Sequence, residues 1–339
     1  MPRTPSISFA NVICRFGDAF VLLDLAEQVI FPAFFDPSLR RKHGETQFLF
    51  LDIGWFATPA RSDRPELCIY GRLVKDTVLH RDQILADGQL LQNHDSIPSA
   101  PSAFFLLMLS NHKLVYLPET AGAPTLDVFG STLQYFFRAK HADYIRAEYV
   151  RRKGTLTETT RLALLDEIPA PTVEVLPLAS RESIGQFVES IEKLTHLEFR
   201  ILDTNREFQM EGPYRKIRED KEALRAKTGK LIYDNSEGMN KPEVANQIAI
   251  SAATGNQYVI VAGTAADGTA MRGNNDQFSL HVPGGDLPEA PNAKGFSLLE
   301  KFREQTANGN LSLDLQENNR DRIEALRNRL EGTDGNPGI

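Results

Sequence analysis

The chain has 339 residues, of which 41% are hydrophobic and 24% are charged, and its formal net charge is −7. This balance is typical of a globular protein large enough for two hydrophobic cores, and it excludes a largely disordered chain. The acidic charge also excludes a protein that coats nucleic acid through bulk positive charge, although it leaves a local basic surface open.

Cysteine content and hydropathy predict the compartment. Cys14 and Cys68 both lie in apolar runs, which favours buried, inert thiols in a reducing cytoplasm. The first residues lack the apolar core of a signal peptide, and the longest apolar run, residues 103–109, is far shorter than the roughly 20 residues that cross a bilayer. We therefore expect a cytoplasmic protein that does not contact a membrane.

Strand patterns dominate the first part of the chain. Apolar alternation or continuous apolar runs predict strands over residues 6–15, 47–55 and 67–78, and a hairpin of residues 104–110 and 114–117 around Asn111 and His112. Helical spacing predicts helices over residues 19–31 and 131–150, and Asp87-Gly88 predicts a turn before a polar segment. We expect residues 1–168 to form a strand-rich α+β domain.

Two prolines mark the expected domain boundary, at Ile168-Pro169-Ala170-Pro171. Strand and helix patterns alternate beyond it, and two helices follow. The expected strands are 173–178, 197–202, 231–233 and a hairpin of 257–263 with 277–282, and the expected helices are 182–194, 206–227, 241–254, 294–305 and 317–330. The fold class is thus α+β with two domains, the second at residues 172–331, and residues 332–339 are expected to be disordered.

Two aspartates follow strands of the second domain. Asp203 comes after the strand 197–202, and Asp234 comes after the strand 231–233. If these strands are parallel neighbours, both carboxylates lie at one edge of the sheet and could bind a divalent cation. The alternative is structural, because Asp is also a common residue in turns and helix caps.

Two groups of basic residues are candidates for nucleic-acid binding. One consists of Arg146, Arg151, Arg152 and Lys153, and the other of Arg215, Arg218, Lys221 and Arg225. Side chains spaced three or four residues apart on a helix share a face that could contact phosphates. Acidic residues are interleaved with the second group, which favours a solvated helix with internal ion pairs over a phosphate-binding ridge.

Two short patterns carry a resemblance to known proteins. These are Asn111-His112-Lys113-Leu114-Val115-Tyr116 and the passage 249–263, which contains Ala252, Gly255-Asn256 and Tyr258. With the opening strand and helix, they resemble uncharacterised bacterial proteins encoded near mobile elements and phage-defence genes. The resemblance implies a bacterial and antiviral context, and it supplies no catalytic residues.

Two functional hypotheses follow. The first is an accessory or effector component of a bacterial anti-phage defence or mobile-element system, which acts through protein contacts and, as a second candidate partner, nucleic acid. The other is a metal-dependent nuclease or phosphotransferase that uses Asp203 and Asp234. No phosphate loop, nucleophile elbow or helical zinc spacing occurs in the sequence, so the catalytic residues stay unknown.

The last predicted helix has a narrow apolar stripe. Ile323, Leu326 and Leu330 lie three and four residues apart, between charges of alternating sign. Such a short helix needs a partner for its apolar face. The partner is either the second domain of the same chain or the same helix of a second copy, as in a homo-oligomer.

Overall fold

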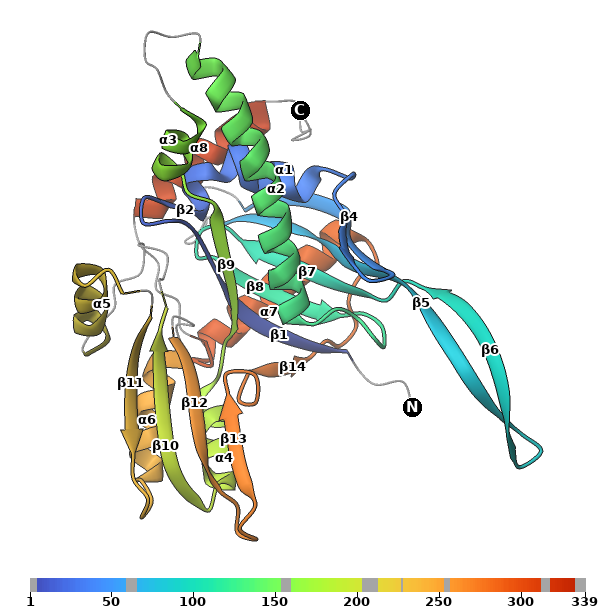
Figure 1. Cartoon of the computed structure of the whole chain (residues 1–339), viewed down its shortest axis with the longest axis vertical. Helices are drawn as coiled ribbons and strands as arrows, with labels where there is room; N and C mark the ends of the chain where they lie inside the picture. Colours follow the sequence, from blue (N-terminus) through green and yellow to red (C-terminus); the bar gives the residue numbers. More distant parts are fainter. Residues whose placement is uncertain are drawn as a thin grey trace.

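The computed structural model describes residues 5–58, 66–153, 160–202, 213–226, 228–252, 257–311 and 318–332. In these residues the chain forms an α+β fold with a ten-stranded sheet and a four-stranded sheet (Figure 1). The class predicted from the sequence is therefore confirmed. Asp203 lies outside the described residues. Of the tail 332–339 that is predicted to be disordered, Gly332 is the last residue of a helix and residues 333–339 lie outside the described residues.

The large sheet has the central order β14-β1-β8-β7-β5-β4-β3. Three further strands lie off this path: β2 and β9 pair with β1, and β6 pairs with β5. Its strands are β1 (Ser6–Phe16), β2 (Phe20–Val21), β3 (Arg41–His43), β4 (Thr46–Ala57), β5 (Leu67–Ala86), β6 (Gln89–Ser99), β7 (Ser102–Met108), β8 (Lys113–Pro118), β9 (Pro171–Pro177) and β14 (His281–Pro283).

β1 lies among strands from distant parts of the chain. It pairs antiparallel with β8 and β2, and also with β14 and β9. The long strand is buried from Ile7 to Phe16, as its apolar sequence requires. Every one of its neighbours except β2 comes from more than 90 residues later in the sequence.

The continuous apolar sequence of β7 reflects burial on both faces of the large sheet. Phe105 and Leu107 join the core beneath α2 (Leu126–Lys153), whereas Phe104 and Leu106 join the core beneath α7 (Pro291–Ala307). Each fully buried side chain of this size stabilises the fold by roughly 1.5–3 kcal/mol relative to exposure. Helices on both faces of the sheet exclude water from these strands (Figure 1).

Aromatic packing holds α2 against the sheet. The Phe50 and Phe136 rings meet edge to face at 5.3 Å, and the Phe105 and Phe129 rings lie 5.0 Å apart. Such pairs contribute about 0.5–1.5 kcal/mol beyond the area they bury. On the other face, Phe302 of α7 lies 6.0 Å from Phe9 of β1.

The predicted helix 19–31 divides into shorter elements. After β2 come the 3-10 helix η1 (Leu22–Leu25), the π-helix η2 (Ala26–Ile30) and the α-helix α1 (Phe31–Phe35). The α-helix continues past Pro32 because proline is tolerated in the first turn, where its missing N–H has no intrahelical acceptor. The single helix predicted over residues 19–31 is therefore wrong in both its start and its end.

The terminal helix α8 (Asn318–Gly332) packs within its own chain. Ile323, Leu326 and Leu330 are buried in the core that also contains α2. Arg329 bonds to Glu27 at 2.6 Å, and Arg322 bonds to Asp24. The apolar stripe of α8 thus packs against the large sheet and its helices, and not against the second domain.

The small sheet has the order β11-β10-β12-β13, with every neighbouring pair antiparallel. Its helices α4 and α6 cover one face, on which Leu197, Phe199 and Val259 are buried (Figure 1). α3 and α5 are the remaining helices of the described residues. The elements not yet given are α3 (Arg161–Glu167), α4 (Arg181–Ser190), β10 (Lys193–Ile201), α5 (Pro213–Ala223), β11 (Gly229–Asp234), α6 (Lys241–Ala252), β12 (Gln257–Thr264) and β13 (Ala270–Asn274).

The boundary predicted at residues 168–171 does not separate the two sheets. β9 and β14 pair with β1 in the large sheet, although both lie beyond that boundary. The expected hairpin of 257–263 with 277–282 is also wrong, because β12 pairs with β13 and His281 pairs with Ser8. No helix in the described ranges is long and apolar enough to cross a membrane.

Candidate interaction site

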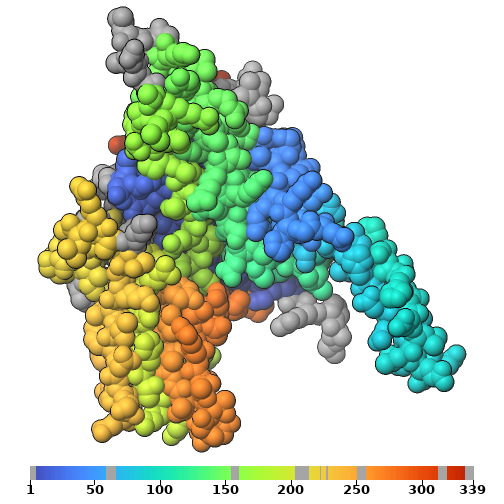
Figure 2. Space-filling view, in the orientation of Figure 1, coloured from blue at the N-terminus to red at the C-terminus, as the bar shows by residue number. Residues whose placement is uncertain are grey.

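The most unusual surface feature is a two-stranded arm formed by β5 and β6. β5 pairs with β4 as far as Asp76 and with β7 as far as Val74. Beyond that point its described pairing is with β6 alone, from Thr77 to Ala86. The hairpin therefore leaves the sheet and projects away from the body (Figures 1 and 2).

A tight turn closes the tip of the arm. Asp87 and Gly88 connect the paired residues Ala86 and Gln89, and both have positive φ angles, 51° and 76°. These angles define the two-residue turn whose twist matches that of an antiparallel hairpin, and Asp-Gly is one of its preferred sequences. The turn predicted at this position is confirmed, but the polar segment after it is a strand.

The register divides the arm into two faces. The pairing register places Leu79 and Leu85 of β5 on the same face as their cross-strand partners, Ile97 and Leu90. A register shift between the Arg81 and Gln83 pairs leaves one more residue on β6 than on β5, so the alternation of β6 restarts at Gln92. We call this surface, together with Arg81, Asp95, Gln83 and Gln92 between the apolar pairs, the leucine face. Its apolar members are 54% (Leu79), 48% (Ile97), 73% (Leu85) and 70% (Leu90) exposed.

Polar contacts fix the middle and the base of the arm. Arg81 Nη2 donates to Asp95 Oδ2 at 2.8 Å and to Asn93 Oδ1 at 3.2 Å. Nearer the body, the His80 ring bonds to Ser96 and Glu45, each at 3.1 Å. These contacts hold the two strands together without burying the leucine face.

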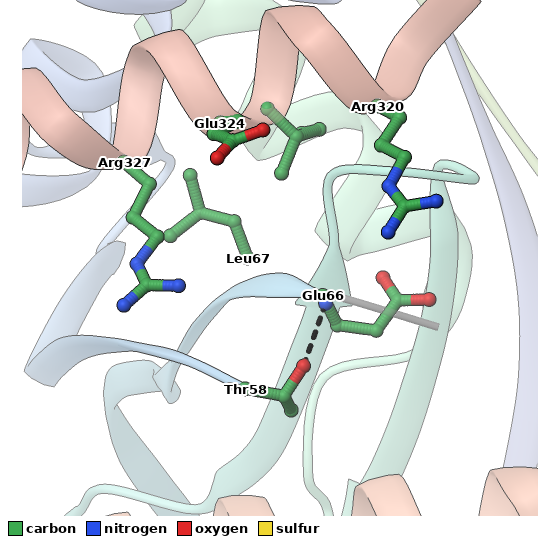
Figure 3. Close-up of a pocket in the computed structure, with 7 residues that line it drawn as sticks. Thr58, Glu66, Leu67, Arg320, Glu324 and Arg327 are labelled. Atoms are coloured by element: carbon green, nitrogen blue, oxygen red, sulfur yellow. Dashed lines mark hydrogen bonds between the residues drawn. The ribbon is translucent and has the colours of Figure 1, made fainter. Parts of the chain in front are cut away.

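A small pocket lies under α8, on the body of the molecule (Figure 3). It has a volume of about 110 Å³ and is lined by Thr58, Glu66, Leu67, Arg320, Ile323, Glu324 and Arg327. The Glu66 N–H donates to Thr58 Oγ1 at 2.7 Å, and the Glu66 carboxylate accepts from the Ser110 hydroxyl. Because both charge signs line the pocket, it does not select a ligand of one charge.

The metal-site hypothesis needs parallel strands, and the structure does not have them at this position. β10 and β11 are antiparallel, so the end of β10 at Ile201 pairs with Gly229 at the start of β11, whereas Asp234 pairs with His196. At about 3.4 Å per residue, the two ends lie roughly 17 Å apart along the strands. Asp203 itself lies outside the described residues.

Asp234 has a different partner. Its Oδ1 lies 2.7 Å from His196 Nδ1 across the strand pair. The described residues contain no group of three or more His, Cys, Asp or Glu side chains that could hold a metal ion. The carboxylate of Asp234 thus serves a cross-strand contact in this structure.

Acidic neighbours pair with three of the four members of the basic group predicted at the end of α2. Glu148 bonds to Arg151 and Arg152 at 2.6 Å each, and Arg152 also bonds to Glu167 at 2.7 Å. The two guanidinium groups hold the pKa of Glu148 at about 2, well below its ordinary value. Lys153 closes the same helix, and Arg146 lies 3.3 Å from Asp143.

The second basic group does not form one exposed ridge. Arg215, Arg218 and Lys221 lie on α5, whereas Arg225 follows it with a positive φ angle of 52°. Lys221 is buried, and Arg215 lies 3.7 Å from Glu219. The Arg215–Glu219 contact agrees with the internal ion pairs of the solvated-helix alternative, whereas buried Lys221 does not lie on a solvated face.

Sequence reasoning missed the arm as a functional feature. The available signal was the apolar pair Leu85 and Leu90, spaced symmetrically about Asp87-Gly88, with Leu79 and Ile97 further out. Polar residues between these positions obscured the alternation. No protein-family model matches the chain, and no curated protein matches its sequence.

Proposed function

We propose that this chain is an accessory component of a protein assembly and that it binds another protein chain through the β5–β6 arm. The observation that carries this proposal is the exposure of Leu85 and Leu90 at the arm tip, 73% and 70%. An isolated two-stranded hairpin has no core of its own and is marginally stable in water. A partner that covers the leucine face would supply the missing apolar burial.

The wider context of the proposal is a bacterial defence or mobile-element system, and that part rests on the sequence resemblance alone. Protein is the better supported partner. Nucleic acid is the weaker candidate, because Glu148 and Glu167 neutralise Arg151 and Arg152, and because Lys221 is buried. The metal-dependent enzyme has no support from the strand arrangement.

Site-specific photo-crosslinking tests the proposed function. A photoreactive amino acid at position 85, in cells that produce the protein, should give a protein adduct. The same group at exposed Glu300 of α7, on the body of the molecule, is the matched control. Absence of an adduct at position 85, or equal adducts at both positions, would contradict a docking role for the arm.

A shortened arm supplies the second test. Residues 78–98 are removed, and Thr77 is joined to Ser99, its register partner, through an Asn-Gly turn. Because the removed residues lie outside both cores, the thermal unfolding temperature should change little. Assemblies that contain the intact protein should be lost from this variant.

A further inference from the structure

We propose that the leucine face of the arm pairs with the same face of a second copy of this chain, with the two arms antiparallel. This inference rests on the proposed function and names the partner. Four features carry it: the order of side chains along the arm, their charges, their exposure and the place where the arm joins the body.

The order of apolar and polar side chains on the leucine face is almost the same from base to tip as from tip to base. Its cross-strand pairs from base to tip are Leu79 with Ile97, Arg81 with Asp95, Gln83 with Gln92, and Leu85 with Leu90. The extra residue of β6 lies between the second and third pairs, at the centre of this order, so two pairs remain on each side of it. Apolar pairs occupy both ends, and hydrogen-bonding side chains occupy the middle. A surface with this symmetry matches itself after a two-fold rotation, which is the requirement for an isologous contact.

The rotation axis would cross the arm between the Arg81 and Gln83 pairs. Leu79 then lies over Leu85 of the partner subunit, and Ile97 lies over Leu90 of the partner subunit. Apolar side chains therefore meet apolar side chains at both ends.

The polar middle also matches under this rotation. Arg81 faces Gln83 of the partner subunit, whose amide oxygen accepts from a guanidinium. Asp95 faces Gln92 of the partner subunit, whose amide nitrogen donates to a carboxylate. The contact therefore leaves no charge without a polar neighbour.

The body of the molecule favours antiparallel over parallel arms. Strand alternation places Ile69 and Leu73 on the same side of β5 as Leu79, and the first two belong to the core covered by α2. Packed sheets lie about 10 Å apart, and a helix layer occupies about the same thickness. If the arms were parallel, the α2 layers of both subunits would have to fit into the space of about 10 Å between the two packed sheets, which holds only one helix layer. If the arms are antiparallel, the body of each subunit lies beyond the arm tip of the other.

The size of the contact predicts a weak dimer. One face of a two-stranded arm is smaller than the roughly 800 Å² per partner of a standard stable interface. We therefore expect an association that depends on protein concentration. Sedimentation of the purified chain over a dilution series should show monomer and dimer in exchange.

Adjacent leucines on opposite faces provide a matched pair of variants. Leu90 lies on the leucine face, whereas Leu91 pairs with Ile84 on the other face. Leu90→Thr should raise the dissociation constant at least tenfold, and Leu91→Thr should change it less than twofold. Threonine keeps a high strand propensity in both cases. Equal effects of the two variants would overturn the proposed face.

Chemical cross-linking tests the antiparallel register. One batch of protein carries Leu79→Cys and a second carries Leu85→Cys, and a short bismaleimide links thiols across the roughly 10 Å between packed sheets. Native Cys14 and Cys68 are fully buried and do not compete. The mixture should give cross-linked dimers, whereas each variant alone should give few. Efficient self-linking of the Leu85→Cys chains would overturn the antiparallel arrangement.

The outcomes separate this inference from the proposed function. A chain that stays monomeric up to its solubility limit overturns the pairing of two copies. If position 85 nevertheless gives a photo-adduct with a different protein, the arm remains a docking element. If it gives no adduct, both proposals fail.

Discussion

Gln134 of α2 and Val173 of β9 are joined by a hydrogen bond in which the Val173 N–H donates to Gln134 Oε1 at 2.6 Å. The same amide donates from Nε2 to the Pro171 carbonyl at 2.7 Å. In the described part of the chain, β9 pairs with β1 along one edge, and the side chain of a helix satisfies backbone groups of this strand that β1 does not. This arrangement protects an edge strand against pairing with other chains.

Replacement of this side chain should weaken the contact between α2 and β9. We expect Gln134→Ala to lower the free energy of unfolding by about 1–3 kcal/mol, because it leaves partly buried backbone groups without partners. Urea unfolding measures the change. Ser131→Ala, at an exposed position one turn earlier, should stay within about 0.5 kcal/mol of the parent. A loss of equal size in both variants would mean that helix propensity, and not the β9 contact, causes the effect.

Gly263 of β12 leaves no room for a side chain. A Cβ atom there would lie 2.2 Å from the Lys193 carbonyl oxygen, next to the register shift after Leu194. Because the obstacle is backbone, Gly263→Ala should destabilise the protein by about 1–3 kcal/mol or more. Gly185→Ala in α4 is the control, since nothing lies within 4 Å of its Cβ position. That variant should be neutral or up to about 1 kcal/mol more stable. Similar stabilities of the two variants would contradict the close approach.

Two carboxylates should make the fold sensitive to acid. Bonding to Lys140 lowers the pKa of Asp36 from 3.8 to about 2, and bonding to Arg151 and Arg152 lowers that of Glu148 from 4.5 to about 2. A depressed pKa in the folded state stabilises the protein above the unfolded-state value, and this contribution disappears as the pH falls through the folded-state value. Urea unfolding should therefore show a loss of stability between about pH 5 and pH 2.

The variant Glu148→Gln isolates one of these contributions. Its deficit relative to the parent should be largest near neutral pH and should shrink as the pH falls through about 2, because the Glu148 carboxyl becomes protonated there and both side chains are then uncharged. A deficit that stays constant with pH would indicate that the packing of Glu148, rather than its charge, stabilises the helix end.

Both native thiols should be unreactive in the folded protein. Cys14 and Cys68 are fully buried, and burial raises the pKa of each thiol well above its ordinary value. Since the thiolate is the reactive form, modification by a thiol reagent should require unfolding. The exposed variant Leu85→Cys should react at once under the same conditions. Rapid modification of either native cysteine without unfolding would contradict the burial.

Local patterns predicted most individual elements, but they could not predict which strands pair. The runs at β1, β7 and β8 were recognised because burial on one or both faces leaves a direct apolar signal. β9 and β14 carry no signal that directs them to β1 rather than to the small sheet, since strand partners depend on long-range packing. The same limit applies to the candidate site. Asp203 and Asp234 matched a pattern for parallel strands, and the antiparallel pairing of β10 with β11 removes its geometric basis.

The arm was missed for a related reason. β5 extends to Ala86, well beyond the predicted end at residue 78. Its outer part pairs with β6 and is not buried in a core, so it lacks the apolar pattern from which strands are predicted. Arg81 and Asp95 form an ion pair across the two strands. In the sequence, charged residues at these positions indicate a polar loop instead of a strand. Sequence patterns detect burial, and the arm is the part of the sheet that is not buried within this chain.

The position of β1 among late strands has a consequence for how the protein is made. A ribosome at about 5–20 residues per second needs tens of seconds to pass from Phe16 to His281. During that time β1 can pair with β2 and then with β8. The strands β9 and β14, which pair with its other edge, are synthesised only later. We therefore expect nascent chains that stop before residue 171 to associate with holdase chaperones, and completed chains to be released once α7 and α8 have packed over the sheet.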